Sequence, residues 1–297
     1  MAVCTGRTAA SVRPALERLA GQRGSFGRLL VVTSGLAGAA LEEHADQART
    51  LGAEVVAEPL TGLSRARNRA LDALGDERVI AFIDDDAMAA PDWAERLSAR
   101  WAEAAADVGC IGGAVVPGWR GTPPRWAAGD VLRGYSLVDL GPGLREIVPP
   151  DEEVYGANIS FAAEALRAVG GFDPARGAWA GVPLAGEESQ AQRRMVERGW
   201  RVLYAGDVRV EHVIAEERLS LRAMLRRRFY YGASGDETLG TPRDGVRRTG
   251  KAAVGAAIAV ARGDHALAGE RAARAAVNAG LAAGPLVRRR LRRRGWP

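Results

Sequence analysis

Residues 79–86, Val-Ile-Ala-Phe-Ile-Asp-Asp-Asp, place three acids directly after an apolar run. Five consecutive apolar residues are typical of a strand that is covered on both faces of a parallel sheet. Ligands of open parallel sheets gather at the carboxyl ends of the strands, which is where these acids fall. Side chains alternate along a strand, so Asp84 and Asp86 should point to one side and Asp85 to the other.

Three adjacent carboxylates repel one another, and burying them unpaired costs considerable free energy. A divalent cation removes that cost, because Mg²⁺ and Mn²⁺ accept carboxylate oxygens and complete their coordination with water and substrate phosphates. The triplet therefore indicates a site for a metal ion and a diphosphate. The alternative is a polar turn in which the aspartates cap the next segment.

The flanking sequence alternates short apolar runs with helical patterns. This alternation predicts βαβ units and an α/β fold built on a sheet. We expect strands at 2–5, 29–33, 54–57, 79–83, 110–116, 158–161, 200–205 and 208–210, and helices at 12–19, 41–51, 65–74, 93–106, 163–169 and 189–198. Ser11 and Ser64 are candidate N-caps of the first and third helices. After Leu219 the pattern becomes helical and basic.

A second acidic motif, Gly186-Glu187-Glu188-Ser189, lies at the start of the 189–198 helix. A helix N-terminus favours negative charge, so capping is one interpretation. The other is a general base, because one carboxylate raises the pKa of its neighbour. His212 follows a strand-like run, and it is either an ordinary histidine or a metal ligand through its neutral imidazole.

Charge is divided unevenly along the chain, whose net charge is +5. Residues 241–297 hold 13 basic and 3 acidic side chains, whereas the preceding 240 residues hold 28 and 33. The end of the chain, residues 287–297, combines six arginines with Leu291 and Trp296. That combination suits the headgroup region of an anionic membrane. The alternatives are a solvated helix face, a segment that docks on another subunit, or a disordered end.

Two cysteines, Cys4 and Cys110, argue against a disulfide scaffold and against a zinc knuckle. The sequence shows no secretory signal and no run of about 18 apolar residues. We therefore expect a cytoplasmic chain that associates, if at all, peripherally with the inner face of the membrane.

The order of these motifs resembles that of family 2 glycosyltransferases of the GT-A fold. The segments that carry the resemblance are Gly62–Asn68, Phe82–Asp86, Gly156–Phe161, Gly170–Asp173, Gly186–Glu188 and Val210–His212. The resemblance implies a single GT-A (Rossmann-like) domain with a mixed central sheet over residues 1–235, and a basic helical extension over 236–297. Within that domain, residues 1–116 would bind the nucleotide and residues 117–235 the acceptor.

The resemblance also implies an inverting, hexosyltransferase-like enzyme that moves a sugar from a nucleotide-diphosphate-sugar to an acceptor hydroxyl. The cofactor would be Mg²⁺ or Mn²⁺, bound by Asp86 and His212. Glu188 is the first choice for the catalytic base and Glu187 the second, although the family usually has Asp at the position of Glu188. The acceptor is an unidentified saccharide, lipid-linked or natural-product hydroxyl.

The donor-binding residues implied by the resemblance come from separate segments of the chain. They are Thr5 and Arg7 on the side of the base, Arg67 and Asn68 near the nucleotide, Asp84 and Asp85 in the triplet, and Gly156 and Asn158 along the donor sugar. The second strand ends in Thr33-Ser34, without the acid that is common in the family, so the base is not assigned. The loop at 173–185 is expected to close over the donor.

Two other functions are compatible with these patterns. A nucleotidyltransferase, or another nucleotide-sugar enzyme, would share the sheet and the metal site, but Cys4–Arg13 lacks a Gly-rich basic loop. A nucleic-acid binder would use the basic tail, but aromatic and basic residues interleave only at 226–231. No specific nucleic-acid partner is therefore expected.

Overall fold

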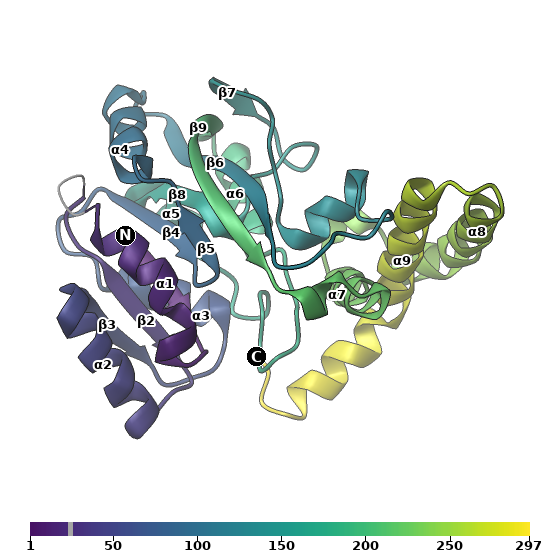
Figure 1. Ribbon diagram of the computed structural model, residues 1–297, viewed down its shortest axis with the longest axis horizontal. Coiled ribbons are helices and arrows are strands. Elements are labelled where there is room, and N and C mark those ends of the chain that lie inside the picture. The colour runs from purple at the N-terminus through teal and green to yellow at the C-terminus, as the bar shows by residue number, and fades with distance from the viewer. Residues whose placement is uncertain (23–25) are drawn as a thin grey trace. The chain divides into compact units, whose positions relative to one another are not determined.

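The computed structural model describes residues 1–22 and 26–297, which form two compact units. Unit 1 comprises Met1–Pro117, Val138–Pro174 and Glu187–Val213, and unit 2 comprises Gly118–Leu137, Ala175–Gly186 and Ile214–Pro297. The colours of Figure 1 follow the chain through both units. The division expected from the sequence, at residues 116 and 235, stays a prediction.

A mixed sheet forms the centre of unit 1. Its strands are β1 (Ala2–Thr5), β2 (Leu30–Ser34), β3 (Glu54–Glu58), β4 (Val79–Asp84), β5 (Ala87–Ala89), β6 (Val108–Trp119), β7 (Leu144–Ile147), β8 (Ile159–Ala162) and β9 (Arg201–Ile214). They lie in the order β3-β2-β1-β4-β8-β6-β9-β5, and β7 pairs with β9. Strands β3, β2, β1 and β4 are parallel, whereas β8 joins β4 antiparallel. The predicted α/β class and mixed sheet are confirmed.

Two helices of unit 1 begin at the expected residues, Trp93 and Ala163, and the others described begin two or three residues earlier than expected. The helices are α1 (Ala9–Ala20), α2 (Ala39–Leu51), α3 (Leu63–Asp72), α4 (Trp93–Glu103), α5 (Ala163–Ala168) and α6 (Glu187–Glu197), with a 3₁₀ turn η3 (Gly156–Asn158) before β8. The predicted caps are wrong, because Thr8 precedes α1 and Gly62 precedes α3. Gly62 has φ of 146°, a conformation open to glycine, and this starts α3 ahead of Ser64, which is buried in the first turn.

Strand β9 is continuous where the sequence predicted two strands separated at Gly206 and Asp207. A glycine weakens a strand, which is why the pattern suggested a break. In the structure, a Cβ at Gly206 would lie 2.0 Å from the carbonyl oxygen of Gly141. The glycine therefore allows a close backbone approach, and β9 continues through it to pair with both β7 and β5.

An aromatic cluster joins the sheet to the residues around the acidic motifs. Phe82 from β4, Phe161 from β8 and Phe172 pack edge to face, with ring centroids 5.6 to 6.3 Å apart. The Arg67 guanidinium lies 5.8 Å from the centroid of Phe82 and 5.5 Å from that of Phe172. Arginine over a buried ring gains a cation–π attraction, so this cluster orients Arg67.

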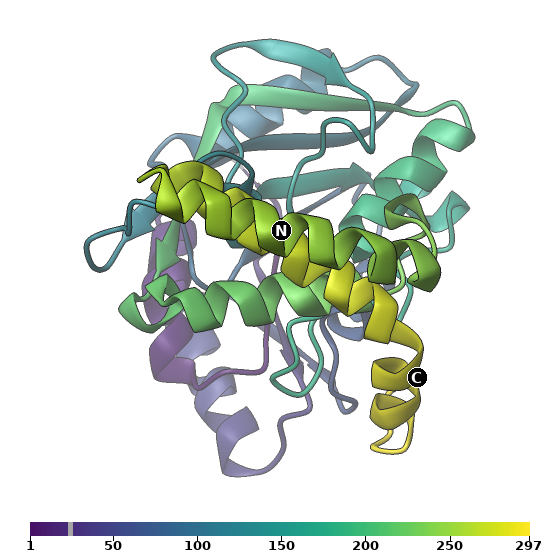
Figure 2. The same cartoon turned by 90° about the vertical axis from the view of Figure 1, so that its right-hand side faces the viewer.

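Unit 2 is mainly helical. Its elements are α7 (Leu221–Ala233), α8 (Pro242–Ala261) and α9 (His265–Arg292), with 3₁₀ turns η2 (Gly129–Tyr135), η4 (Glu216–Leu219) and η5 (Glu237–Leu239). Helix α9 packs along both α7 and α8 (Figure 2). A Cβ at Gly232 would lie 1.9 Å from the Val277 carbonyl oxygen, and one at Gly280 1.8 Å from that of Phe229. Glycine therefore lets α7 and α9 approach closely, and the predicted helical C-terminal segment is confirmed.

The end of the chain folds back onto unit 2. Leu291 and Trp296 are buried with Val182 and Leu184, which come from the Gly/Pro-rich loop at 175–186. These two side chains are therefore not available to a lipid headgroup region, contrary to the expectation from the sequence. Across the described parts of the chain, no helix combines the length and apolarity needed to cross a bilayer.

Candidate active site

The carboxyl end of β4 brings the acidic triplet next to β9. Strand β5 begins at Ala87, whose partner in β9 is His212. The Val213 N–H donates to the carbonyl oxygen of Asp86 at 2.8 Å. This pairing places His212 Nε2 3.0 Å from Asp86 Oδ1. Sheet pairing thus joins two residues that are far apart in the sequence.

Asp84, Asp86 and His212 form a group with the chemistry of a metal site. One ligand atom from each lies within 4.8 Å of those from the other two. Carboxylate oxygens suit Mg²⁺ and Mn²⁺, and imidazole nitrogen suits first-row transition metals. The side chains present therefore fit a divalent cation.

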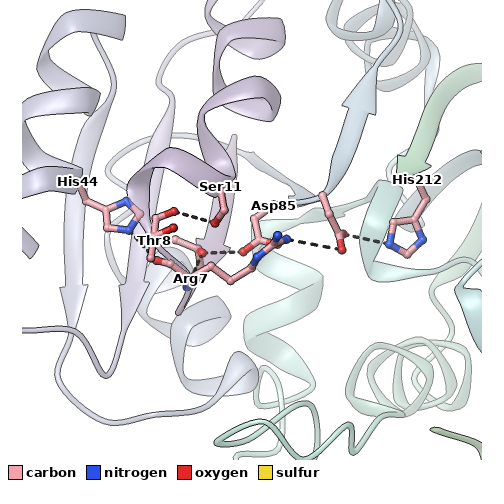
Figure 3. A network of polar contacts seen from close by, with 8 residues as sticks. Arg7, Thr8, Ser11, His44, Asp85 and His212 are labelled. Atoms are coloured by element: carbon pink, nitrogen blue, oxygen red, sulfur yellow. Dashed lines mark hydrogen bonds and ion pairs between the residues drawn. The ribbon is translucent and has the colours of Figure 1, made fainter. Parts of the chain in front are cut away.

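Asp85 lies beside Arg7 (Figure 3), whereas Asp84 and Asp86 group with His212. Thr5 Oγ1 donates to Asp85 Oδ2 at 2.6 Å, and Arg7 Nη1 lies 3.3 Å from Asp85 Oδ1. The same Arg7 nitrogen lies 3.8 Å from Asp86 Oδ2. Burial raises the pKa of Asp85 to about 6, against the hydrogen bond from Thr5, which lowers it. Thr5 and Arg7 thus hold the middle aspartate, and the donor contacts expected of them stay predictions.

His44 contributes to this arrangement and was not predicted from the sequence. Its Nε2 lies 2.9 Å from the Arg7 carbonyl oxygen (Figure 3), and its ring is buried under α2. The contact fixes the backbone that carries Arg7. A histidine on a helical pattern gives no sequence signal for such a role, because its partner is a main-chain atom of another element.

Arg67 connects the two acidic motifs and is only 2% exposed. Its Nη1 lies 2.8 Å from Glu187 Oε1 and 3.9 Å from Glu188 Oε2, and its Nη2 lies 3.3 Å from Asp84 Oδ1. A Cβ at Gly156 would lie 2.0 Å from Arg67 Nη2. The glycine therefore leaves the space that the guanidinium occupies between the triplet and the glutamate pair.

Burial and neighbouring charges together set the pKa values of this cluster. Burial, and then the charge of Glu188, raise the pKa of Glu187 to about 8, although Arg67 lowers it. Burial also raises the pKa of Asp84, again against the attraction of Arg67. For Arg67, burial lowers the pKa, but Glu187, Asp84 and Glu188 together raise it above its ordinary value. Near neutral pH, Glu187 therefore keeps its proton and Arg67 stays charged.

Asn68 and Asn158 bind protein groups in this structure. The Asn68 amide exchanges hydrogen bonds with the Phe172 main chain at 2.7 and 2.8 Å. Asn158 accepts from Trp93 Nε1 at 2.8 Å and donates to two main-chain carbonyls at 2.8 and 3.0 Å. Both amides thus hold the segments that carry the site, and their donor contacts stay predictions.

Comparison with known proteins gives a second line of evidence beside the geometry of the site. A sequence model described as "Glycosyl transferase family 2" matches residues 2–139, which include Thr5, Arg67 and the acidic triplet. Residues 2–139 of this chain are similar to glycosyl transferase family 2. The resemblance noted in the sequence is thereby confirmed.

One curated relative of this chain is the glucosyl-dolichyl phosphate glucuronosyltransferase of Haloferax volcanii. The two are 33% identical over 181 residues, which cover 58% of this chain and 54% of the relative. The chain thus matches about half the length of that protein.

Solved structures similar to this chain have low sequence identity to it. Glucosyl-3-phosphoglycerate synthase from Mycobacterium tuberculosis is 14% identical, with a TM-score of 0.46 over 76% of this chain and 77% of that chain. GalNAc-T7, solved with UDP, GalNAc and Mn²⁺, is 14% identical, with a TM-score of 0.48 over 80% and 52%. TarS 1–349 from S. aureus is 13% identical, with a TM-score of 0.49 over 80% and 65%.

Replacing Arg67 with Met should lower the free energy of unfolding by about 3–5 kcal/mol, because it leaves buried carboxylates without their cation. The pKa of Glu187, about 8, lies above the ordinary value of 4.5. Between these values the unfolded chain releases the proton and the folded chain keeps it, so stability falls as pH rises. Arg67 lowers that pKa, so its loss should extend the fall to higher pH.

Urea denaturation at pH 6 and pH 9 measures this effect. The deficit of Arg67→Met relative to the unaltered chain should be larger at pH 9. Arg69→Met is the matched control, because Arg69 is exposed on the same helix and should change stability little. An equal and small effect of both substitutions at both pH values would contradict the role of Arg67.

Proposed function

We propose that the chain transfers a sugar from a nucleotide-diphosphate-sugar to an acceptor hydroxyl, with inversion at the anomeric carbon. The similarity of residues 2–139 to glycosyl transferase family 2 supports this function. The observation that carries it is the connection, through Arg67, of the group Asp84, Asp86 and His212 to the pair Glu187 and Glu188. Both motifs lie in unit 1, so one folded unit supplies the cation ligands and the carboxylates.

Asp86 and His212 would hold a divalent cation, with Asp84 beside them. A bound cation supplies charge stabilisation to the departing nucleotide diphosphate. We propose Mn²⁺ ahead of Mg²⁺, because an imidazole nitrogen joins the carboxylates and Mg²⁺ prefers oxygen ligands. Arg67 holds Asp84 in place at 3.3 Å, and Thr5 and Arg7 hold Asp85 toward the expected nucleotide side.

Glu188 is the proposed general base, and Glu187 positions it. A base must be ionised to accept the proton of the acceptor hydroxyl. Glu187 is protonated near neutral pH and is bound to Arg67 at 2.8 Å, so it does not fill that role. The side chain of Glu188 is 12% exposed, against 3% for Glu187, and lies farther from Arg67. The more accessible carboxylate is therefore the one that can meet an acceptor.

The substrate class is proposed from the curated relative. Its name describes glucuronosyl transfer to glucosyl-dolichyl phosphate. By that similarity we propose a nucleotide-linked glucuronic acid as the first donor to test, and a sugar on a lipid phosphate as the acceptor class. Such an acceptor would bring the chain to a membrane surface.

Calorimetry with a panel of nucleotide-diphosphate-sugars tests the proposed function without an acceptor. The panel carries glucose or glucuronic acid on uridine, guanosine or thymidine diphosphate, with Mn²⁺, Mg²⁺ or EDTA. One nucleotide class should bind with Mn²⁺ and weaken at least about tenfold with EDTA, since the cation bridges protein and diphosphate. Absence of binding throughout would refute the proposal. Release of pyrophosphate from a nucleoside triphosphate and a sugar phosphate would instead favour a nucleotidyltransferase.

A further inference from the structure

Helix α8 presents an apolar face that no described residue covers. Val246, Val254, Ile258 and Val260 are 69, 61, 43 and 59% exposed. The opposite side of α8 packs on α9 through small residues, with Gly245, Gly255 and Ala259 buried. At 3.6 residues per turn, Val246, Val254 and Ile258 fall on the outward side, away from these buried positions. The helix therefore has a packed small-residue side and an exposed aliphatic side.

Basic residues flank this aliphatic face. Arg243, Arg247, Arg248 and Lys251 lie in the first half of α8, and Arg262 follows its last residue. Asp244 is the sole acid within α8, and it caps the helix through Thr241. It lies 3.7 Å from Arg247 and 3.9 Å from Arg248, so the surplus of positive charge remains.

The apolar stretch of α8 is too short to span a bilayer. Its residue pattern is that of a helix that lies along the membrane surface. Residues 252–261 are ten consecutive apolar or small residues, whereas a membrane-spanning helix needs about 20. An interfacial helix combines an aliphatic side with basic residues beside it. A helix of 20 residues lying flat would extend about 30 Å along a surface.

We propose that the outer face of α8 docks on an anionic bilayer surface, with Val254 and Ile258 at the boundary of the acyl chains. Arg243 and Arg247 would then contact lipid phosphates. Charge favours lipid over a second copy of this chain, because two such faces would bring arginines against arginines. This surface differs from the C-terminal residues singled out in the sequence, since Leu291 and Trp296 are buried in unit 2.

Vesicle flotation with the full chain tests the proposal. The chain should float with vesicles of phosphatidylglycerol and phosphatidylcholine, and much less with phosphatidylcholine alone. Val254→Asp with Ile258→Asp should reduce the bound fraction at least about tenfold, because both charges would enter the apolar boundary. Arg243→Gln with Arg247→Gln should weaken binding by about fivefold per charge removed, and this loss should shrink at high salt.

Val148→Asp is the matched control, because Val148 is an equally exposed aliphatic residue of unit 1. It should float like the unaltered chain, and circular dichroism should show equal helix content for all variants. Failure of the unaltered chain to float on anionic vesicles would overturn the proposal. Equal flotation of the Val254 and Ile258 variant would also overturn it and would assign binding to another basic segment.

Light scattering after size-exclusion chromatography tests whether the outer face of α8 instead binds a second copy of this chain. A dimer of the unaltered chain that becomes a monomer in the Val254 and Ile258 variant would assign the face to a second copy and overturn the lipid proposal. Flotation needs neither donor nor acceptor. A failure of membrane binding can therefore be distinguished from a failure of sugar-nucleotide binding in the calorimetric test.

Discussion

Glu188→Gln should leave donor binding unchanged and lower the turnover of sugar transfer by about 10²–10⁴-fold, which is the usual contribution of a general base. The amide keeps the size of the side chain but cannot take the proton of the acceptor hydroxyl. Donor affinity should persist, because the proposed cation ligands lie in the other acidic motif. Calorimetry for the donor and initial rates with a saturating acceptor separate the two effects.

Glu187→Gln is the matched comparison for that experiment. Glu187 keeps its proton near neutral pH, because its pKa is about 8, so an amide mimics its main form there. The variant should therefore retain most of its turnover at pH 7. It should also remove part of the loss of stability between pH 5 and pH 8, since it carries no ionisable proton. An inactive Glu187→Gln beside an active Glu188→Gln would reverse the assignment.

Asp86→Ala should abolish sugar transfer and cation-dependent donor binding together. Asp86 lies 3.0 Å from His212 and belongs to the group of possible metal ligands. Losing a ligand removes charge stabilisation worth several kcal/mol in the transition state, on the order of 10³-fold in rate. The binding loss distinguishes this variant from Glu188→Gln, in which only the rate should fall.

Calorimetric titration of Mn²⁺, with and without the sugar nucleotide, measures the effect of Asp86→Ala. Asp92→Ala is a suitable control, because Asp92 is a partly exposed aspartate that pairs with Arg96 on the surface of unit 1. It should bind the cation and the donor like the unaltered chain. Full Mn²⁺-dependent donor binding by Asp86→Ala would contradict the assignment of this residue.

Local sequence patterns were enough to predict the acidic triplet and its position at the end of a strand of the sheet. An apolar run followed by Asp84, Asp85 and Asp86 specifies both a buried strand and a polar end, and both are found. The alternation of side chains also predicted that Asp84 and Asp86 lie together, and both group with His212. These features depend on neighbours in the sequence, which is why they could be predicted.

Contacts between distant segments could not be predicted in the same way. Arg67 was expected near a diphosphate, and no local pattern indicated that it would lie between Asp84 and Glu187. That arrangement depends on the space left by Gly156, which follows from the folded backbone. The contacts of His44 and Trp296 could not be predicted for the same reason. His44 contacts a main-chain carbonyl of another element, and Trp296 packs on a distant loop.

The burial of Trp296 links the order of two segments of unit 2, Ala175–Gly186 and the end of the chain. Val182 and Leu184 precede the glutamate pair by only a few residues, and they share one small apolar cluster with Leu291 and Trp296. If either segment moves away, the apolar side chains of the other become exposed to water. We therefore expect residues 182–184 and 291–296 to become ordered or to fray together, as one cooperative element. Substitutions that detach the C-terminal segment should therefore also loosen residues 182–184, which lie a few residues before Glu187 in the chain.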